Sequence, residues 1–157
     1  MRNLALLSVL SLLVVACDDN GTQPTPTTTT TTTAGPTAGV FEMEVIDAGL
    51  LVSQASGNLF FVELRIEETA GVGGQINFIR LDYFRATGEL EERSEIGASD
   101  ITAELGTNDI EANETWQETP VFFFRASIKR GRQLVVTVSI TDDRGNRVEL
   151  TEGFIVT

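Results

Sequence analysis

Hydrophobic and polar residues alternate along six stretches of the chain after residue 40. A period of two is that of a β-strand with one buried face, because successive side chains point to opposite sides of the pleat. No apolar pattern with the three-to-four spacing of a helix continues beyond two turns. We therefore predict antiparallel sheets, with strands over residues 41–45, 60–67, 79–84, 122–128, 134–141 and 148–156, the last bent near Glu152-Gly153.

The pattern weakens between residues 87 and 120, an acidic segment whose only base is Arg93. Residues 90–96 and 101–105 fit short edge strands, and they equally fit a loop with a helical turn. The run Phe122-Phe123-Phe124 is prone to aggregate if it lies at a sheet edge. We expect it on a central strand.

The first residues have the pattern of an export signal. Arg2 precedes an apolar stretch over residues 4–15, and Ala16 supplies the small residue that signal peptidases need. A membrane-spanning helix needs about 20 apolar residues. The stretch is shorter than that and ends at Asp18-Asp19, so we expect residues 1–16 to be a cleaved signal peptide.

Val14-Val15-Ala16-Cys17 resembles the lipobox of bacterial lipoproteins. The resemblance covers the first 17 residues and implies that Cys17 is diacylglyceryl-modified at sulfur. Cys17 then becomes an acylated (palmitate-type) N-terminus, and such chains together anchor a protein firmly. The alternatives are an ordinary secretory signal ending in cysteine and a buried thiol. Asp18 resembles an inner-membrane retention signal, but the resemblance leaves inner and outer membranes, and periplasmic and surface exposure, open.

Residues 17–39 are expected to be a lipidated linker. This segment contains three prolines and an unbroken threonine run from 27 to 33, so it cannot bury enough apolar surface to fold. Residues 40–157 are long enough for one domain with its own core.

Composition narrows the chemistry of that domain. It carries ten basic and 21 acidic side chains, a net charge of about −11, which disfavours nucleic acid as a partner. The chain has no histidine and Cys17 is its only cysteine. Disulfides, thiol catalysis, Ser-His-Asp triads and ordinary zinc sites are therefore excluded within one chain. We expect no cofactor.

The C-terminal stretch over residues 134–146, an alternating strand that runs into Asp-Asp-Arg-Gly-Asn, resembles the final hairpin of bacterial immunoglobulin-like, fibronectin-III-like and cadherin-like modules. It implies an all-β, immunoglobulin-like two-sheet antiparallel sandwich. The core cysteine pair of true immunoglobulins is missing, Trp116 lies late in the chain, and the penultimate strand has no tyrosine. A small antiparallel barrel is the alternative fold.

Oxygen-bearing side chains cluster at that hairpin and in the preceding acidic segment. Asp142, Asp143 and Asn146 form a weak candidate for Ca²⁺, but Asp and Asn beside Gly145 are also what a tight turn requires. We favour the turn, and hence no metal. Four further acidic residues stand at a spacing that does not define a site: Asp100, Asp109, Glu111 and Glu114. We expect them to form a solvent-exposed face.

A possible binding surface comes from the alternation itself. Phe61, Phe123 and Val135 occupy positions that face away from the core, and exposed aromatic residues often mark binding surfaces. Trp116 is the fourth candidate. The alternative is that Trp116 closes one end of the core or that the register is shifted by one residue.

Three classes of function remain. The favoured class is a non-catalytic binding or adhesion module, anchored to a membrane of the bacterial cell envelope through Cys17, with a protein or glycan partner. The second is a structural accessory subunit of an envelope complex, which a large apolar outer face would favour. An enzyme, most plausibly a carboxylate-dependent hydrolase, is disfavoured because the alternation brings no two acids together in a cleft.

Overall fold

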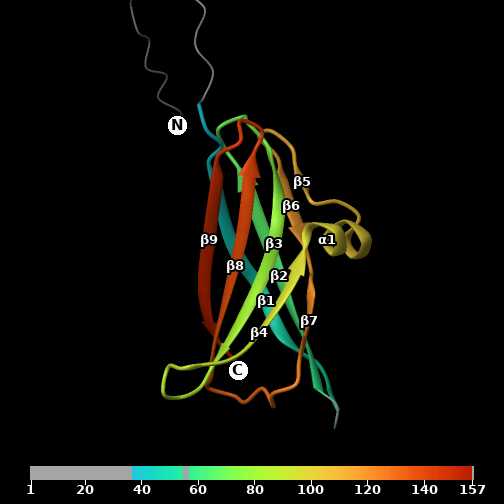
Figure 1. Cartoon of the computed structure of the whole chain (residues 1–157), viewed down its shortest axis with the longest axis vertical. Coiled ribbons are helices and arrows are strands. Elements are labelled where there is room, and N and C mark those ends of the chain that lie inside the picture. The colour runs from blue at the N-terminus through green and yellow to red at the C-terminus, as the bar shows by residue number, and fades with distance from the viewer. Residues whose placement is uncertain (1–36, 55–56, 157) are drawn as a thin grey trace, which may run out of the picture. The chain divides into compact units, whose positions relative to one another are not determined.

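A computed structural model describes residues 37–54 and 57–156 of the chain, which belong to one unit. The predicted signal peptide, Cys17 and most of the linker lie outside the described residues. Among the residues that the structure describes, no helix is long and apolar enough to cross a membrane. Strands make up most of the unit (Figure 1), and the elements are β1 (Phe41–Gln54), β2 (Gly57–Glu68), β3 (Gly74–Phe84), β4 (Leu90–Gly97), α1 (Ala98–Leu105), β5 (Asp109–Ile110), β6 (Thr115–Glu118), β7 (Val121–Phe124), β8 (Gln133–Asp142) and β9 (Arg147–Ile155).

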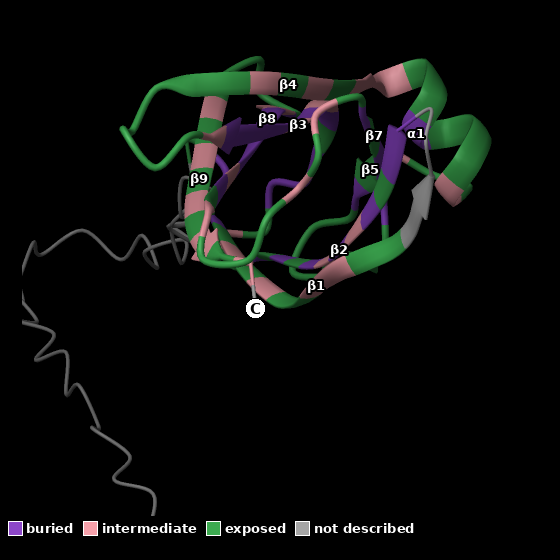
Figure 2. Ribbon diagram, turned by 90° about the horizontal axis from the view of Figure 1, so that it is seen from below, coloured by how far each residue is buried: buried purple, intermediate pink, exposed green. Residues whose placement is uncertain are grey.

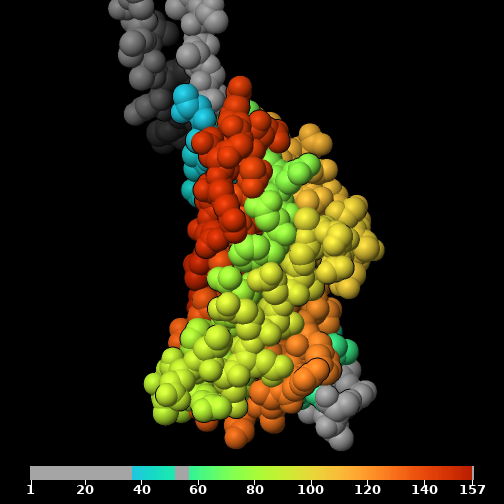
Figure 3. Space-filling model, viewed as in Figure 1, coloured from blue at the N-terminus to red at the C-terminus, as the bar shows by residue number. Residues whose placement is uncertain are grey.

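The strands form two antiparallel sheets. In the first sheet β2 pairs with β1 along one side and with β6 and β7 along the other. The second sheet has the order β4-β3-β8-β9, with β5 added to the end of β3. Figure 3 shows the face of this second sheet, where β9 and β8 (red) are followed by β3 (green) and β4 (yellow). The sandwich-like arrangement agrees with the predicted all-β class.

All six predicted strands are present, with changed ends. The first continues from residue 45 to Gln54, because β-bulges after Val45 and Leu50 let it follow β2 along its whole length. The fourth ends at Phe124, four residues early. The last, β9, is one continuous strand that pairs with β8 through Glu152 and Gly153.

The weakly patterned segment contains both a strand and a helix. Residues 90–96 form β4, as one of the two interpretations predicted, whereas residues 101–105 belong to α1 and not to an edge strand. Ile101 is the buried residue of this helix. Gly106, at a φ of 91°, ends it and donates its N–H to the carbonyl of Thr102.

The core lies between the two sheets. Figure 2 looks along the sheets and shows buried residues lining the space between β2 on one side and β3 and β8 on the other. The alternation predicted the inward-facing residues correctly, because the pleat places every second side chain on the same face. The largest fully buried side chains are Tyr83, Phe60, Phe122, Phe124, Leu64, Ile66, Ile76, Ile79, Leu81, Ile101, Leu134 and Ile140.

The two sheets approach each other at both edges without joining into a closed barrel. On one side Glu92 of β4 accepts hydrogen bonds from the backbone N–H groups of Arg125 and Ala126, at 2.9 and 2.6 Å. On the other side Glu152 of β9 accepts the N–H of Val45 of β1 at 3.1 Å. Backbone pairing stops at these edges, so the fold is two sheets and the barrel alternative is wrong.

The Phe122-Phe123-Phe124 run lies at a sheet edge, contrary to prediction. It makes up most of β7, which pairs with β2 on one side only. Phe122 and Phe124 are fully buried and Phe123 points outward. The Glu92 carboxylate covers the backbone that follows the run, and a covered edge is protected against pairing with another chain.

Candidate binding surface

Two of the four predicted surface residues meet on the outer face of the first sheet. Phe61 on β2 lies opposite Val121 on β7, and Leu59 lies opposite Phe123. We call these four residues the outer patch. Phe123 is 48% exposed, Leu59 and Val121 are also exposed, and Phe61 is partly covered. An exposed cluster of large apolar side chains is a candidate for contact with a partner.

Two glycines position the aromatic rings of the outer patch. A Cβ built on Gly49 would lie 2.9 Å from the ring of Phe61, and one built on Gly57 would collide with the ring of Phe123. Each ring therefore covers bare backbone, as aromatic side chains do beside glycines in sheets. The rings are held against the sheet, which lowers the conformational entropy that they would lose on binding.

The outer patch occupies only one end of this face. Toward the other end β1 and β2 present Glu42, Glu44, Arg65 and Glu67, which line a shallow depression with Met43. Arg65 forms an ion pair with Glu44 at 3.5 Å. The face is therefore apolar at one end and charged toward the other.

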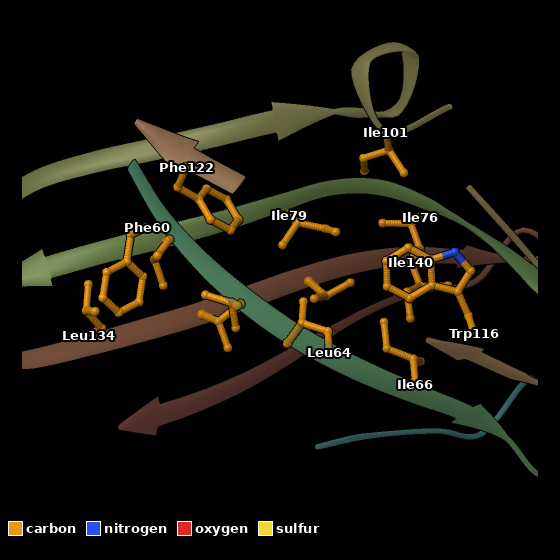
Figure 4. Packing of buried hydrophobic residues seen from close by; sticks show 14 of the residues in the cluster. Phe60, Leu64, Ile66, Ile76, Ile79, Ile101, Trp116, Phe122, Leu134 and Ile140 are labelled. Atoms are coloured by element: carbon orange, nitrogen blue, oxygen red, sulfur yellow. The ribbon is translucent and has the colours of Figure 1, made fainter. Parts of the chain in front are cut away.

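Trp116 belongs to the core and not to a surface. It is 5% exposed, lies opposite Ile66 in the register of β2 and β6, and donates its indole N–H to the carbonyl of Thr107 at 3.2 Å. Figure 4 shows it in the buried cluster with Ile76 and Ile140. The alternative prediction, that Trp116 closes one end of the core, correctly placed this side chain in the core.

Val135 faces outward, as predicted, but on the other sheet. It lies on β8 between Asp82 of β3 and Gly153 of β9. Its neighbours on that face are mainly polar, since Arg93 holds Asp82 through two hydrogen bonds of 2.6 and 3.0 Å. Val135 therefore does not share a surface with Phe61 and Phe123.

The candidate Ca²⁺ residues form the turn between β8 and β9. Asp142 is buried, and its carboxylate accepts the backbone N–H groups of Gly39, Arg144 and Asn146 together with the side-chain amide of Asn146. Both carboxylate oxygens are occupied by N–H donors. The arrangement is that of an Asx-type turn, which also fixes Gly39 at the entrance to β1.

These donors control the ionisation of Asp142. Burial by itself would raise its pKa, but the hydrogen bonds from the Asn146 side chain and from the N–H groups of Gly39, Asn146 and Arg144 favour the charged form. They lower the pKa of Asp142 from 3.8 to about 2.

A second buried carboxylate, Glu68, was not singled out from the sequence. It lies at the end of β2, is 1% exposed, and accepts N–H groups from Ala70, Gly71, Val72 and Asn113. Burial opposes its charge, yet the backbone hydrogen bonds lower the pKa of Glu68. The sequence did contain a signal that Glu68 is buried, because the alternation along β2 places residue 68 on the same inward face as Ile66.

The acidic segment forms an open surface depression. Asp109, Glu111 and Glu114 line it next to Trp116, in a volume of about 310 Å³, whereas Asp100 lies apart in the first turn of α1. Among the described residues, no three acidic side chains converge closely enough to hold a metal ion.

Comparison with known proteins identifies a fold and not a family. No family model and no curated protein matches the sequence. A solved structure of the Northeast Structural Genomics Consortium target SoR45 is similar over 74% of this chain and 85% of its own, with a TM-score of 0.56 and 15% identity. A structure described as an ApaA protein from Bordetella pertussis is similar over 76% and 94%, with a TM-score of 0.54 and 14% identity. At such identities the likeness concerns the all-β fold alone.

Proposed function

We propose that the chain is a bacterial lipoprotein whose immunoglobulin-like domain is a non-catalytic binding module, displayed from a membrane of the cell envelope on an acylated Cys17. The observation that carries the binding role is the outer patch. The anchor rests on the lipobox-like residues 14–17. The partner class is an envelope or extracellular protein, or a glycan, that presents an apolar surface.

The strand order supports the immunoglobulin-like assignment. A sheet of β1, β2 and β6–β7 faces a sheet of β4, β3, β8 and β9. Successive strands β2 and β3 lie in different sheets, as do β7 and β8. In immunoglobulin-like sandwiches the second and third strands, and the fifth and sixth, likewise change sheets.

The limited extent of the outer patch favours a binding module over a permanently packed accessory subunit. Obligate interfaces bury large and mainly apolar areas. Here one end of the outer face of the first sheet is charged, and the outer face of the second carries Arg80, Asp82, Arg93 and Thr137. Contact through one end of one face suits a partner that binds and leaves.

Site-directed photo-crosslinking in intact cells tests the proposal. A photoreactive amino acid replaces Phe123, and we expect one discrete crosslinked species. The matched control places the same amino acid at Thr151, on the outer face of β9. The proposal requires that position 151 yield no such species. A series of many crosslinked species from both positions, or no crosslinked species from either position, would contradict the proposal.

Phe123→Ser provides the second arm of the test. It removes the most exposed ring of the outer patch, at a position where the side chain points away from the core, so the fold should persist. We expect the crosslink from a photoreactive residue at Val121 to be lost in this variant, while the circular dichroism spectrum stays unchanged.

A further inference from the structure

The edge between β1 and β9 is incompletely closed. Neither strand pairs its backbone with the other, since β1 pairs with β2 and β9 pairs with β8. Glu152 bridges them near the middle through the N–H of Val45. Beyond this bridge, toward the end of β1, the apolar interior reaches solvent.

Leu50 shows this opening directly. In register it lies opposite Phe60, which is 1% exposed and faces the core. Residues opposite each other on paired strands point to the same side. Leu50 therefore points to the inner face, yet 44% of it is exposed. An inward leucine with this exposure lines a space that the protein's own side chains do not fill.

The opposite wall comes from the segment between β7 and β8 and from the end of β9. Ile128 and Val156 line it, and with Ala48, Gly49, Leu50 and Arg130 they enclose a cavity of about 260 Å³. The wall is held in place by hydrogen bonds. The Tyr83 hydroxyl donates to the carbonyl of Ser127 and accepts the N–H of Lys129, while the backbone of Val156 pairs with Gly131 and Arg132.

Arg130 supplies the one charged side chain of this lining. Within the described part of the chain, no carboxylate lies within ion-pair distance of its guanidinium. Lys129 and Arg132 flank it in sequence, so the segment is basic in a domain whose net charge is about −11. The side chains of Leu50, Ile128 and Val156 beside the Arg130 cation match a ligand that has an apolar tail and an anionic head.

We propose that this cavity binds an anionic amphiphile, with a short acyl chain or the end of a longer one against Leu50, Ile128 and Val156 and its head group on Arg130. The volume is just below the roughly 300–1,000 Å³ of sites for drug-sized molecules, which suits one chain and not a whole diacyl lipid. Removal of the chain's methylene groups from water favours binding, and the Arg130 guanidinium selects the negative head. The site is separate from the outer patch.

Dodecanoate and dodecanol are the probes, because they share a chain and differ in head-group charge. The protein is the chain without residues 1–16, carrying Cys17→Ser, so that neither the apolar N-terminal stretch nor an acyl group competes. We expect calorimetric titration below the micelle concentration to show saturable one-to-one binding of dodecanoate and weaker binding of dodecanol.

Three variants locate the site. Arg130→Gln should weaken dodecanoate about tenfold, the effect of losing one charge-assisted hydrogen bond, and leave dodecanol unchanged. Ala48→Leu fills the cavity and should weaken both probes. Lys129→Gln, the matched control, removes a neighbouring charge that does not line the cavity and should change neither affinity by more than about twofold.

Vesicles distinguish the source of the amphiphile. Sedimentation with phosphatidylglycerol-containing vesicles that depends on Ala48 and Arg130 would indicate a membrane lipid, whereas capture of dodecanoate alone would indicate a free acid. The proposal is overturned if no probe binds saturably, if Ala48→Leu has no effect, or if Arg130→Gln and Lys129→Gln weaken dodecanoate equally. The outer-patch crosslinks use other residues, so either proposal can fail alone.

Discussion

At the scale of single residues, two buried carboxylates hold together the end of the domain where β1 begins. Asp142 binds Gly39 and the β8–β9 turn, and Glu68 binds the loops after β2 and after β5. The N–H groups of Gly39 and Val72 among these donors form buried hydrogen bonds, and a buried N–H group without a partner would destabilise the fold. These residues organise the fold and take no part in the proposed binding.

Acidic pH should lower the free energy of unfolding of the domain by protonating the carboxylates of Asp142 and Glu68. Their pKa values are lower in the folded chain than the ordinary 3.8 of Asp142 and 4.5 of Glu68. A lowered pKa stabilises the fold above the ordinary value, and this stabilisation is lost as the pH falls. We expect the free energy of unfolding to be level near neutrality and to fall from about pH 4.5 toward the Asp142 pKa of about 2, as urea titrations at successive pH values would show.

Asp142→Asn makes the pH prediction specific. The variant should be less stable at pH 7, because an amide has one acceptor oxygen where the carboxylate has two. It should also lose less stability than the wild type between pH 4 and pH 2. Asp143→Asn, one residue away and exposed, is the control. An Asp142→Asn profile parallel to the wild type would contradict the assignment.

Tyr83 joins β3 to the segment that follows β7 through its hydroxyl group. The sequence has no tyrosine on the strand where sandwich domains place their tyrosine corner. Tyr83, at the end of β3, is fully buried and binds the segment that leads into β8 through Ser127 and Lys129. Its burial was predictable from alternation, whereas these two partners, more than 40 residues away, were not.

At the scale of elements, the end of β7 is held by a side chain of β4, the strand across the edge of the sandwich. The two N–H groups that follow it, at Arg125 and Ala126, are bound by the Glu92 side chain. A carboxylate on β4 therefore occupies the N–H groups at the end of an aromatic edge, where another chain could otherwise pair. The alternation predicted which of the three phenylalanines point inward, but not the position of β7 in its sheet.

Glu92→Ala should expose this edge. We expect faster amide hydrogen exchange at Arg125 and Ala126 and more aggregation on heating, with destabilisation of about 1 kcal/mol, the usual net worth of such bonds. Glu91→Ala is the matched control, since Glu91 forms an ion pair with Arg85 at 4.0 Å and, among the described residues, no hydrogen bond to the segment after β7. Equal exchange rates in the two variants would refute the proposed cover.

The helix α1 docks through the buried Ile101, with the partly buried Leu105 packed against the core beside it. Eight residues make a helix that is marginal alone, and the N-cap Gly97 provides no side-chain hydrogen bond. Ile101, fully buried, joins it to the core. The alternation of residues 101–105 was compatible with a strand because five residues are too few to separate the two periods.

Ile101→Ala should lower the free energy of unfolding by about 2–4 kcal/mol, the range for truncating a buried aliphatic residue. Chemical denaturation measures it. Ala103→Ser on the exposed face of α1 is the control, with an expected change below about 0.5 kcal/mol. A loss below 1 kcal/mol for Ile101→Ala would show that the helix contributes little to the core.

At the scale of the whole molecule, the proposed binding role combines a domain with an attachment to a membrane. The outer patch gives the domain a surface, and residues 14–17 provide the proposed anchor. The proposed anchor does not require the immunoglobulin-like fold, and the fold does not require the anchor.

Cys17→Ser tests the anchor. Without the thiol no acyl chain can be added at sulfur, so we expect the chain to leave the membrane fraction or to remain as an uncleaved precursor. Mass spectrometry of the wild-type N-terminus should show the added acyl mass. Unchanged fractionation of Cys17→Ser together with an unmodified wild-type mass would refute the anchor.

The local pattern predicted six of the nine strands and the inward and outward sides of each, because pleating depends only on neighbouring residues, but it did not predict β5 or β6. It also supplied the lipobox-like motif, which remains a prediction. Only the tertiary structure decided which sheet each strand joins, and so separated Val135 from Phe61 and Phe123 and placed Trp116 in the core. The partners of Asp142 and Glu68 and the cavity at Leu50 likewise arise from contacts between distant segments, which a period of two does not encode.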